Sequence, residues 1–174
     1  QKANEINRVI VVSNHSKNIF ENTVYTAHHK DNPQQTFEFR ATTPIDAVDY
    51  PTKKFENLPE LDIELDYDIN FLTVAQFGPR KNIPNTMRWF VDEFRDEGVG
   101  LVLKTNLAKN SAMDREQTFN DFTKFLGTLG ERKCKVYLLH GDMEDDEMHS
   151  LYLHPQISAL LALPHGEGFG LPIF

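Results

Sequence analysis

Apolar positions recur with two different periods along the chain. Continuous apolar runs of strand length occur at residues 8–13, 71–77, 99–104, 136–139 and 158–163, a pattern typical of strands buried on both faces. Between these runs apolar residues stand three or four positions apart, as on one face of a helix. One such face has Met87, Phe90, Val91 and Phe94, and a second has Phe119, Phe122, Leu126 and Leu129. A further helix is predicted at residues 144–153.

Strands that alternate with helices at this spacing predict an α/β fold. Right-handed crossovers then give a doubly wound, parallel, Rossmann-like sheet with helices on both faces. The sequence stops soon after the run at residues 158–163, so we expect the sheet to be incomplete at its C-terminal edge. An open edge can pair with another strand. Residues 8–13 or a second copy of the chain, in a homo-oligomer, are the two candidates for covering it.

Shorter signals predict where some elements begin and end. Ser13 has the side chain of a helix N-cap, for a short helix that runs to Asn22. Residues 24–26 and 36–40 are expected to pair as a hairpin. Asp114 and Gln117 stand three positions apart and resemble a capping box for the second long helix. The acidic run at residues 60–66 follows several prolines and is interpreted as a linker or an edge segment.

Charge and cysteine content limit the class of partner. The 174 residues include 18 Lys and Arg against 26 Asp and Glu, a formal net charge of −8, which argues against nucleic acid or an anionic membrane as the main partner. A small anionic ligand held by local cations stays possible. The only cysteine, Cys134, excludes an internal disulfide framework and favours a reducing, cytoplasmic location. No apolar run is long enough to span a membrane.

Candidate chemistry lies in the loops after the predicted strands, because open α/β sheets bind ligands beyond the carboxyl ends of their strands. Arg80 and Lys81 follow one strand, where a pair of cations suits a phosphate or simply forms a solvated turn. After another strand, glycines occupy the alternate positions Gly166, Gly168 and Gly170. They allow either close approach of backbone N–H groups to an anion or a tight turn with positive φ. Glu167, within that loop, suits hydrogen bonds from sugar hydroxyls.

Three stretches together resemble a known enzyme family. They are residues 71–82 (FLTVAQFGPRKN), Leu151-Tyr152, and residues 167–172 (EGFGLP), and they resemble the group 1 (family 4) glycosyltransferases, which are retaining, two-domain enzymes of the glycosyltransferase B (GT-B) fold. The resemblance covers residues 70–174, and more loosely residues 10–20. It implies that residues 1–25 are a remnant of the N-terminal acceptor domain, residues 26–68 an irregular linker and hairpin, and residues 69–174 a truncated nucleotide-sugar-binding domain.

The resemblance also implies an activity and a site. The donor is a nucleoside-diphosphate sugar, the acceptor a carbohydrate or a lipid-linked molecule, and no metal cofactor is expected. Lys81 contacts the diphosphate and Glu167 faces the hexose, as the two catalytic residues. Donor-binding roles fall to Arg80, Gly78, His140, Gly141, His165, Gly166, Gly168, Phe169, Gly170 and Leu171. The acids at positions 142 and 144–147 are interpreted as complementing a helix dipole rather than binding a metal.

Two departures from the family pattern leave an alternative open. Gln76 stands where the family often has arginine, and the family's second acid would fall one residue past Phe174. We therefore expect residues 1–174 alone to be inactive in transfer. The alternative function is a non-catalytic nucleotide-binding module or a decayed glycosyltransferase, which Gln76 favours. A flavodoxin-like domain has less support, because no early loop has a Ser/Thr cluster that could hold a phosphate.

Overall fold

The computed structural model describes residues 2–32, 34–167, 170 and 172. The chain divides into two compact units, Gln1–Lys54 and Phe55–Phe174. The assignment of residues 1–25 to an acceptor domain stays a prediction.

The first unit contains two small two-stranded sheets. Its elements are a short 3-10 helix (η1, Lys2–Glu5), β1 (Val9–Val11), α1 (Asn14–Asn22), β2 (Tyr25–His28), β3 (Thr36–Phe39) and β4 (Ile45–Ala47). The predicted hairpin is confirmed, since β2 and β3 pair antiparallel with Tyr25 opposite Phe39. The Ser13 cap is also confirmed: its side chain accepts a hydrogen bond from the Ser16 amide at 3.1 Å. β4 was not predicted, and it pairs parallel with β1.

The second unit is the parallel α/β sheet that the apolar runs predict. Its elements in chain order are β5 (Asn70–Val74), η2 (Pro79–Lys81), α2 (Ile83–Phe94), β6 (Gly100–Lys104), α3 (Ala112–Gly127), β7 (Lys135–Leu139), α4 (Asp145–Tyr152) and β8 (Ile157–Leu160). Among the described residues, the strands form one parallel sheet in the order β7-β6-β5-β8. Each crossover contains a helix, as a parallel sheet requires.

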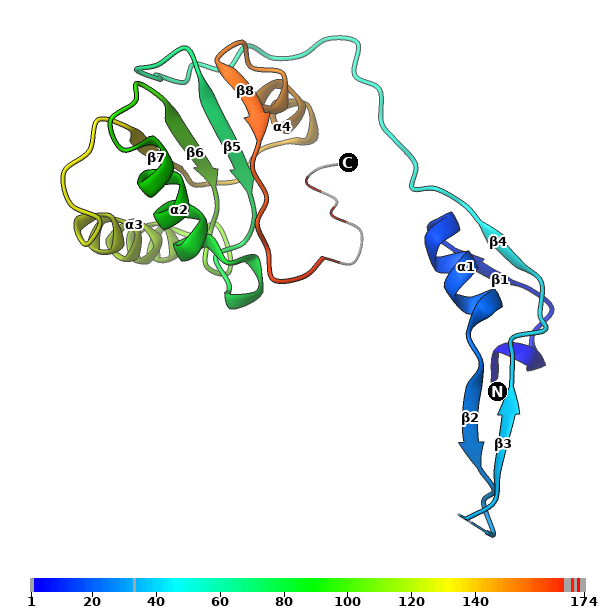
Figure 1. The fold of residues 1–174 in the computed structure, drawn as a ribbon. Helices are drawn as coiled ribbons and strands as arrows, with labels where there is room; N and C mark the ends of the chain where they lie inside the picture. The colour runs from blue at the N-terminus through cyan, green and yellow to red at the C-terminus, as the bar shows by residue number, and fades with distance from the viewer. Residues whose placement is uncertain (1, 33, 168–169, 171, 173–174) are drawn as a thin grey trace. The chain divides into compact units, whose positions relative to one another are not determined.

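Helices cover both faces of this sheet (Figure 1). On one face α2 and α3 pack on alternate residues of β6, with Leu101 and Leu103 fully buried against Met87 and Phe122. On the other face α4 packs against the intervening residues, including Val102. Because successive strand residues point to opposite faces, one short apolar strand supplies both cores. The doubly wound Rossmann-like class is thereby confirmed.

The acidic run before β5 has a structural role. It has no regular secondary structure, but its alternate apolar residues pack with the α4 face: Leu61, Ile63 and Leu65. One hydrogen bond holds the chain just before the run, from the Ser150 hydroxyl to the Pro59 carbonyl at 2.7 Å, and another holds its end, from the Tyr137 hydroxyl to the Asp66 carboxylate at 2.9 Å. The alternation of acids with aliphatic residues thus puts the charges in solvent and the apolar side chains on the core.

Two local predictions about α3 are wrong. Ser111, not Asp114, is the N-cap, and its hydroxyl accepts from the Asp114 amide at 3.2 Å. Gln117 instead donates to Asp121, so no capping box forms with Asp114. Phe119 was expected in the core but is 56% exposed. The apolar face of α3 is therefore narrower than its spacing suggests, with Phe122 as its buried centre.

Within the described residues β8 pairs only with β5, so it lies at the edge of the sheet, and β1 pairs with β4 instead. Association of two copies through this edge stays a prediction. Among the described helices none has the length and apolar character to cross a bilayer.

Candidate functional site

The turn after β5 presents Arg80 and Lys81 at the carboxyl edge of the sheet. Gly78 precedes the 3-10 turn, and its carbonyl accepts a hydrogen bond from the Lys81 amide at 3.0 Å. Asn82 ends the turn with φ 57° and ψ 29°, a left-handed conformation that asparagine tolerates better than most residues. Pro79 before the two cations and Asn82 after them therefore explain why Arg80 and Lys81 lie in a compact turn.

The loop after β8 is joined to this turn by three hydrogen bonds. The His165 amide donates to the Arg80 carbonyl at 2.9 Å, and the Arg80 guanidinium donates to the Gly166 carbonyl at 2.8 Å. The Asn82 side-chain amide donates to the Leu163 carbonyl at 3.0 Å. Loops that are more than 80 residues apart in the sequence therefore lie side by side at one edge of the sheet.

Glu167 joins the two loops electrostatically. Its carboxylate oxygen Oε1 pairs with the Lys81 ammonium and lies 3.1 Å from the Arg80 guanidinium. The hydrogen bond from Lys81, with a further one from Arg80, holds the pKa of Glu167 below its usual range although partial burial opposes this. The Lys81 side chain is 17% exposed and that of Arg80 is 60% exposed. Two cations around one carboxylate leave a local positive charge that is open to solvent on the arginine side.

Two pockets flank Lys81. One is lined by Lys81 and Glu167 together with Thr73, Leu163, Gly170 and Pro172. The other, of about 290 Å³, is lined by Gln76, Lys81, Lys104, Thr105, Asn106 and Met148. Lys81 thus lines both a space beside Glu167 and a second space at the carboxyl ends of β5 and β6.

The glycine-rich loop is described only in part. Gly170 is buried and has φ 79°, so the positive φ that was one interpretation of these glycines is observed at this position. The predicted donor-binding residues Gly168, Phe169 and Leu171 lie outside the described residues.

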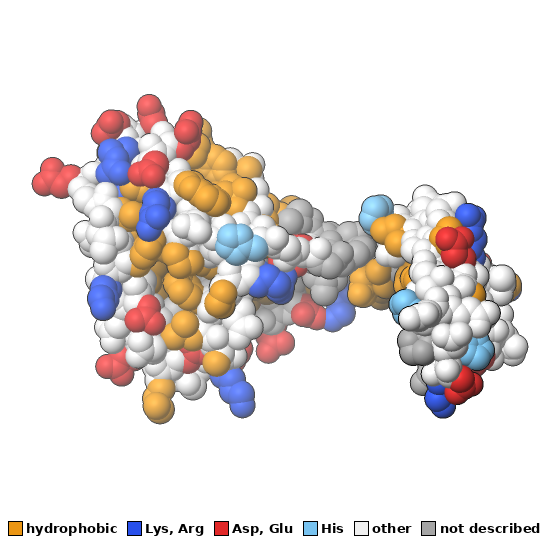
Figure 2. All heavy atoms as spheres, turned by 60° about the horizontal axis from the view of Figure 1, so that its bottom comes forward, with side chains coloured by type: hydrophobic (Ala, Val, Ile, Leu, Met, Phe, Trp, Pro, Cys, Tyr) orange, Lys and Arg blue, Asp and Glu red, His pale blue; other side chains and the backbone are white. Residues whose placement is uncertain are grey.

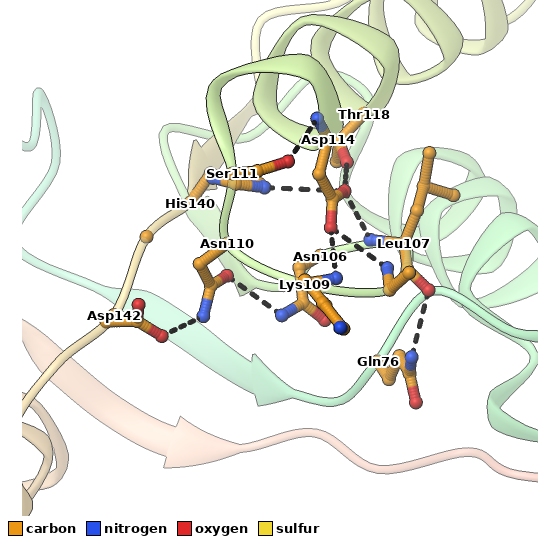
Figure 3. Close-up of polar contacts among 12 residues, drawn as sticks. Gln76, Asn106, Leu107, Lys109, Asn110, Ser111, Asp114, Thr118, His140 and Asp142 are labelled. Atoms are coloured by element: carbon orange, nitrogen blue, oxygen red, sulfur yellow. Dashed lines mark hydrogen bonds and ion pairs between the residues drawn. The ribbon is translucent and has the colours of Figure 1, made fainter.

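A polar network braces the other loops at this edge (Figure 3). The Asp114 carboxylate, from the first turn of α3, accepts hydrogen bonds from the successive backbone amides of Leu107, Ala108 and Lys109. It also accepts one from the Thr118 hydroxyl. Burial alone would raise the pKa of Asp114, but these bonds hold it well below its usual range. Asp114 therefore acts as a fixed anion that shapes the loop after β6.

The network also places His140 and Gln76. The His140 imidazole is 4% exposed, and its Nε2 lies 3.6 Å from Asp114 Oδ1. It points toward α3 (Figure 3), and His140 and Gly141 both line a pocket beside that helix. The Gln76 side-chain amide donates to the Leu107 carbonyl at 2.9 Å. Gln76 thus braces the loop after β6 in place of adding a cation.

Sequence reasoning missed Lys104 and Thr105. Lys104 is the last residue of β6, and its ammonium donates to the Gly141 carbonyl. The available signal was a lysine that ends an otherwise apolar strand at the ligand-binding edge. Figure 2 brings this edge of the sheet forward and shows acidic and basic side chains interspersed with apolar ones. Selection for the charge of a ligand at this face therefore depends on local groups such as Lys104.

Comparison with known proteins bears on the fold. No family model and no curated protein matches the sequence. In its fold the chain is similar to a solved structure. That structure is OtsA in its apo form, a trehalose-6-phosphate synthase of the GT-B fold, with a TM-score of 0.51 and 11% identity. The match covers 94% of this chain and 41% of the OtsA chain. At this identity the similarity shows the fold alone.

Proposed function

We propose that this chain is the donor-binding part of a retaining glycosyltransferase, which moves a hexose from a nucleoside-diphosphate sugar to a hydroxyl acceptor. The observation that supports this most is the meeting of Arg80 and Lys81 with Glu167. They come from two loops at the carboxyl edge of a parallel sheet, where such sheets bind ligands. The glycosyltransferase-like fold is consistent with the proposal.

Each member of this cluster has a role in the proposal. Lys81 and Arg80 stabilise the negative charge that develops on the leaving diphosphate, which is electrostatic catalysis by fixed cations. Glu167 accepts hydrogen bonds from hexose hydroxyls, and His165 lies beside it in the loop. Backbone N–H groups of the glycine-rich loop, with Gly166 at its start, complete the phosphate contacts. The backbone at Gly141 borders the nucleotide base.

The energetics are sufficient for anchoring. Each charge-assisted hydrogen bond to phosphate contributes about 1.5–3 kcal/mol. Two such bonds, from Lys81 and Arg80, give roughly 4 kcal/mol, the scale of millimolar binding. Contacts to the base and the sugar add to this value. The cluster therefore supplies an anchor for the diphosphate, and selectivity must come from the groups around it.

A nucleotide-binding module without transferase activity is the second candidate. The observation that favours it is Gln76, which is neutral and engaged with Leu107. A chain of this kind would bind the nucleoside diphosphate and its sugar conjugate equally well. A donor site in which Glu167 binds the hexose would instead bind these two ligands with different affinities.

Calorimetric titration tests the proposal. UDP, GDP and ADP, each with its hexose conjugate, are titrated into the wild-type chain, Lys81→Ala, Glu167→Gln and the exposed-lysine control Lys109→Ala. We expect one base to be bound, Lys81→Ala to weaken its diphosphate about tenfold or more, and Lys109→Ala to bind normally. Glu167→Gln should weaken the sugar conjugate more than the free diphosphate. Absence of binding for every nucleotide, or no effect of Lys81→Ala, would refute a donor site here.

A further inference from the structure

Lys104 differs from the other cations of the site in its partner. It ends β6 on the same side of the strand as Val102, toward α4, and it is half-buried. Its ammonium donates to the neutral carbonyl of Gly141. Among the described residues no carboxylate lies within ion-pair distance of this ammonium. Burial lowers the pKa of Lys104, with the nearby charge of Asp142 opposing the shift. The charge of this lysine is therefore only weakly compensated.

The pocket around Lys104 combines two lysine side chains and an unused hydrogen-bonding group with apolar side chains such as Met148. Lys104 and Lys81 approach the pocket of about 290 Å³ from different elements, and Thr105 lies beside them in its lining. The Thr105 side chain is buried, and its hydroxyl has no partner among the described residues. Two ammonium groups around one space repel each other, and a buried hydroxyl without a partner costs free energy. An anion in this pocket would relieve both.

Lys81 connects this pocket to the cluster with Glu167, because it lines both spaces. We propose that Lys104, assisted by the Thr105 hydroxyl, binds the phosphate of the donor that is attached to the nucleoside, while Lys81 and Arg80, beside Glu167, bind the phosphate that carries the hexose. This inference rests on the proposed function, which it deepens by adding two residues to the donor site. It also accounts for the neutral Gln76, since the second cation comes from β6 rather than from the loop after β5.

A purely structural role for Lys104 predicts a different outcome. Its bond to Gly141 ties β6 to the loop after β7, and such a brace would affect folding stability without distinguishing a nucleotide from its nucleoside. The contrast between the nucleoside monophosphate and the nucleoside of the same base separates the two roles. The nucleoside lacks the group that Lys104 would bind, and the monophosphate lacks only the group that Lys81 would bind.

The test compares the affinity of the preferred nucleoside diphosphate, its monophosphate and its nucleoside for the wild-type chain, Lys104→Met, Lys104→Arg, Thr105→Val, Lys81→Ala and the matched control Lys109→Met. Lys109 has an exposed side chain in the loop that follows β6, so its loss changes the net charge equally. We expect Lys104→Met to weaken both the diphosphate and the monophosphate about tenfold to a hundredfold and the nucleoside less than threefold, whereas Lys81→Ala should weaken the diphosphate alone. Lys104→Arg should restore most of the affinity, and Thr105→Val should cost a few fold.

Equal loss for the monophosphate and the nucleoside, or no loss at Lys104→Met while Lys81→Ala abolishes diphosphate binding, would overturn the role of Lys104 and leave the proposed function standing. Failure of the wild-type chain to bind any nucleotide would instead overturn the proposed function and this inference with it. Because Lys104→Met could unfold the chain, the wild-type protein is also acetylated with and without nucleoside diphosphate. We expect the nucleotide to slow acetylation at Lys104 at least fivefold and to leave Lys109 unaffected, and equal rates at Lys104 would contradict the inference.

Discussion

Asn82 is the residue that most directly links the fold to the candidate site, because it follows Lys81 and bonds to the loop after β8. It is 4% exposed and has φ 57°. Its side chain donates to the Leu163 carbonyl at 3.0 Å and accepts from the Asn85 side chain at 2.6 Å. Substitution of Asn82 by glycine and by alanine therefore separates two contributions, the side-chain hydrogen bonds and the left-handed backbone.

The expected magnitudes follow from this geometry. Both Asn82→Gly and Asn82→Ala lose two hydrogen bonds, about 0.5–1.5 kcal/mol each in the free energy of unfolding. Glycine adopts the observed φ without strain but costs about 0.5–1 kcal/mol in chain entropy. Alanine adds about 1–2 kcal/mol for a Cβ in the left-handed region. We therefore expect alanine to be the less stable variant, by about 0.5–1 kcal/mol.

Urea unfolding followed by tryptophan fluorescence measures this difference. Trp89 is the only tryptophan of the chain and lies in α2, so its signal reports the second unit. With a slope of about 2 kcal/mol per molar urea, the midpoint of Asn82→Ala should fall roughly 0.3–0.5 M below that of Asn82→Gly. Asn85→Ala, which removes only the bond between the two asparagines, is the control. An alanine variant as stable as the glycine variant, or a glycine variant as stable as the wild type, would refute the reasoning.

Three further predictions concern stability and reactivity. A Cβ at Gly100 would lie 2.0 Å from Asn70 Oδ1 and 2.7 Å from Tyr137 Cε2, so Gly100→Ala should lower the unfolding free energy by about 1–3 kcal/mol in the same assay. The pKa of Asp114 is lower in the folded state, so its stabilisation is present above its unfolded pKa of about 3.9 and is lost as the pH falls through the folded value. Asp114→Asn should accordingly lower the thermal midpoint at pH 7, and the gap to wild type should close as the pH falls below 4. Burial raises the pKa of the Cys134 thiol, so iodoacetamide should alkylate Cys134 slowly in buffer and rapidly in denaturant. Fast alkylation of the native chain would contradict its packed position.

The strands of the second unit were predictable because each is a short apolar run that the sheet buries on both faces. Their ends were less predictable. The run at residues 71–77 continues past β5, which ends at Val74, because Ala75 and Phe77 remain partly buried against the α2 core after the strand has ended. Burial, which produces the apolar run, extends further than strand pairing does.

Elements defined by distant partners were not predictable from local pattern. β4 has only three residues, with Asp46 at its centre, and exists because β1 pairs with it across more than thirty residues. Asp114 lies at a position where a cap is expected, yet its partners are amides five to seven residues earlier in the chain. A spacing rule for caps considers only the residues that follow, so it assigned the wrong role.

The same distinction applies to the candidate site. That the turn with Arg80 and Lys81 would meet the loop with Glu167 could be anticipated, because the carboxyl ends of neighbouring parallel strands share one edge of the sheet and β5 and β8 are neighbours. The position of Lys104 could not. A lysine that ends a strand is usually solvated, and its approach to the pocket depends on the strand face that it occupies and on the loop of Gly141.

The pairing of Glu167 with both cations has a consequence for the donor in the proposed function. A diphosphate that binds Lys81 competes with Glu167 for the same ammonium, so the free diphosphate must leave that carboxylate with fewer hydrogen-bond donors. A hexose attached to the diphosphate supplies hydroxyl donors where Glu167 lies. Lys104 has no carboxylate to release among the described residues, and it can bind phosphate without this cost. In this arrangement one phosphate binds Lys104 without displacing a carboxylate. The other phosphate displaces Glu167 from Lys81, and it does so most favourably when the sugar is present.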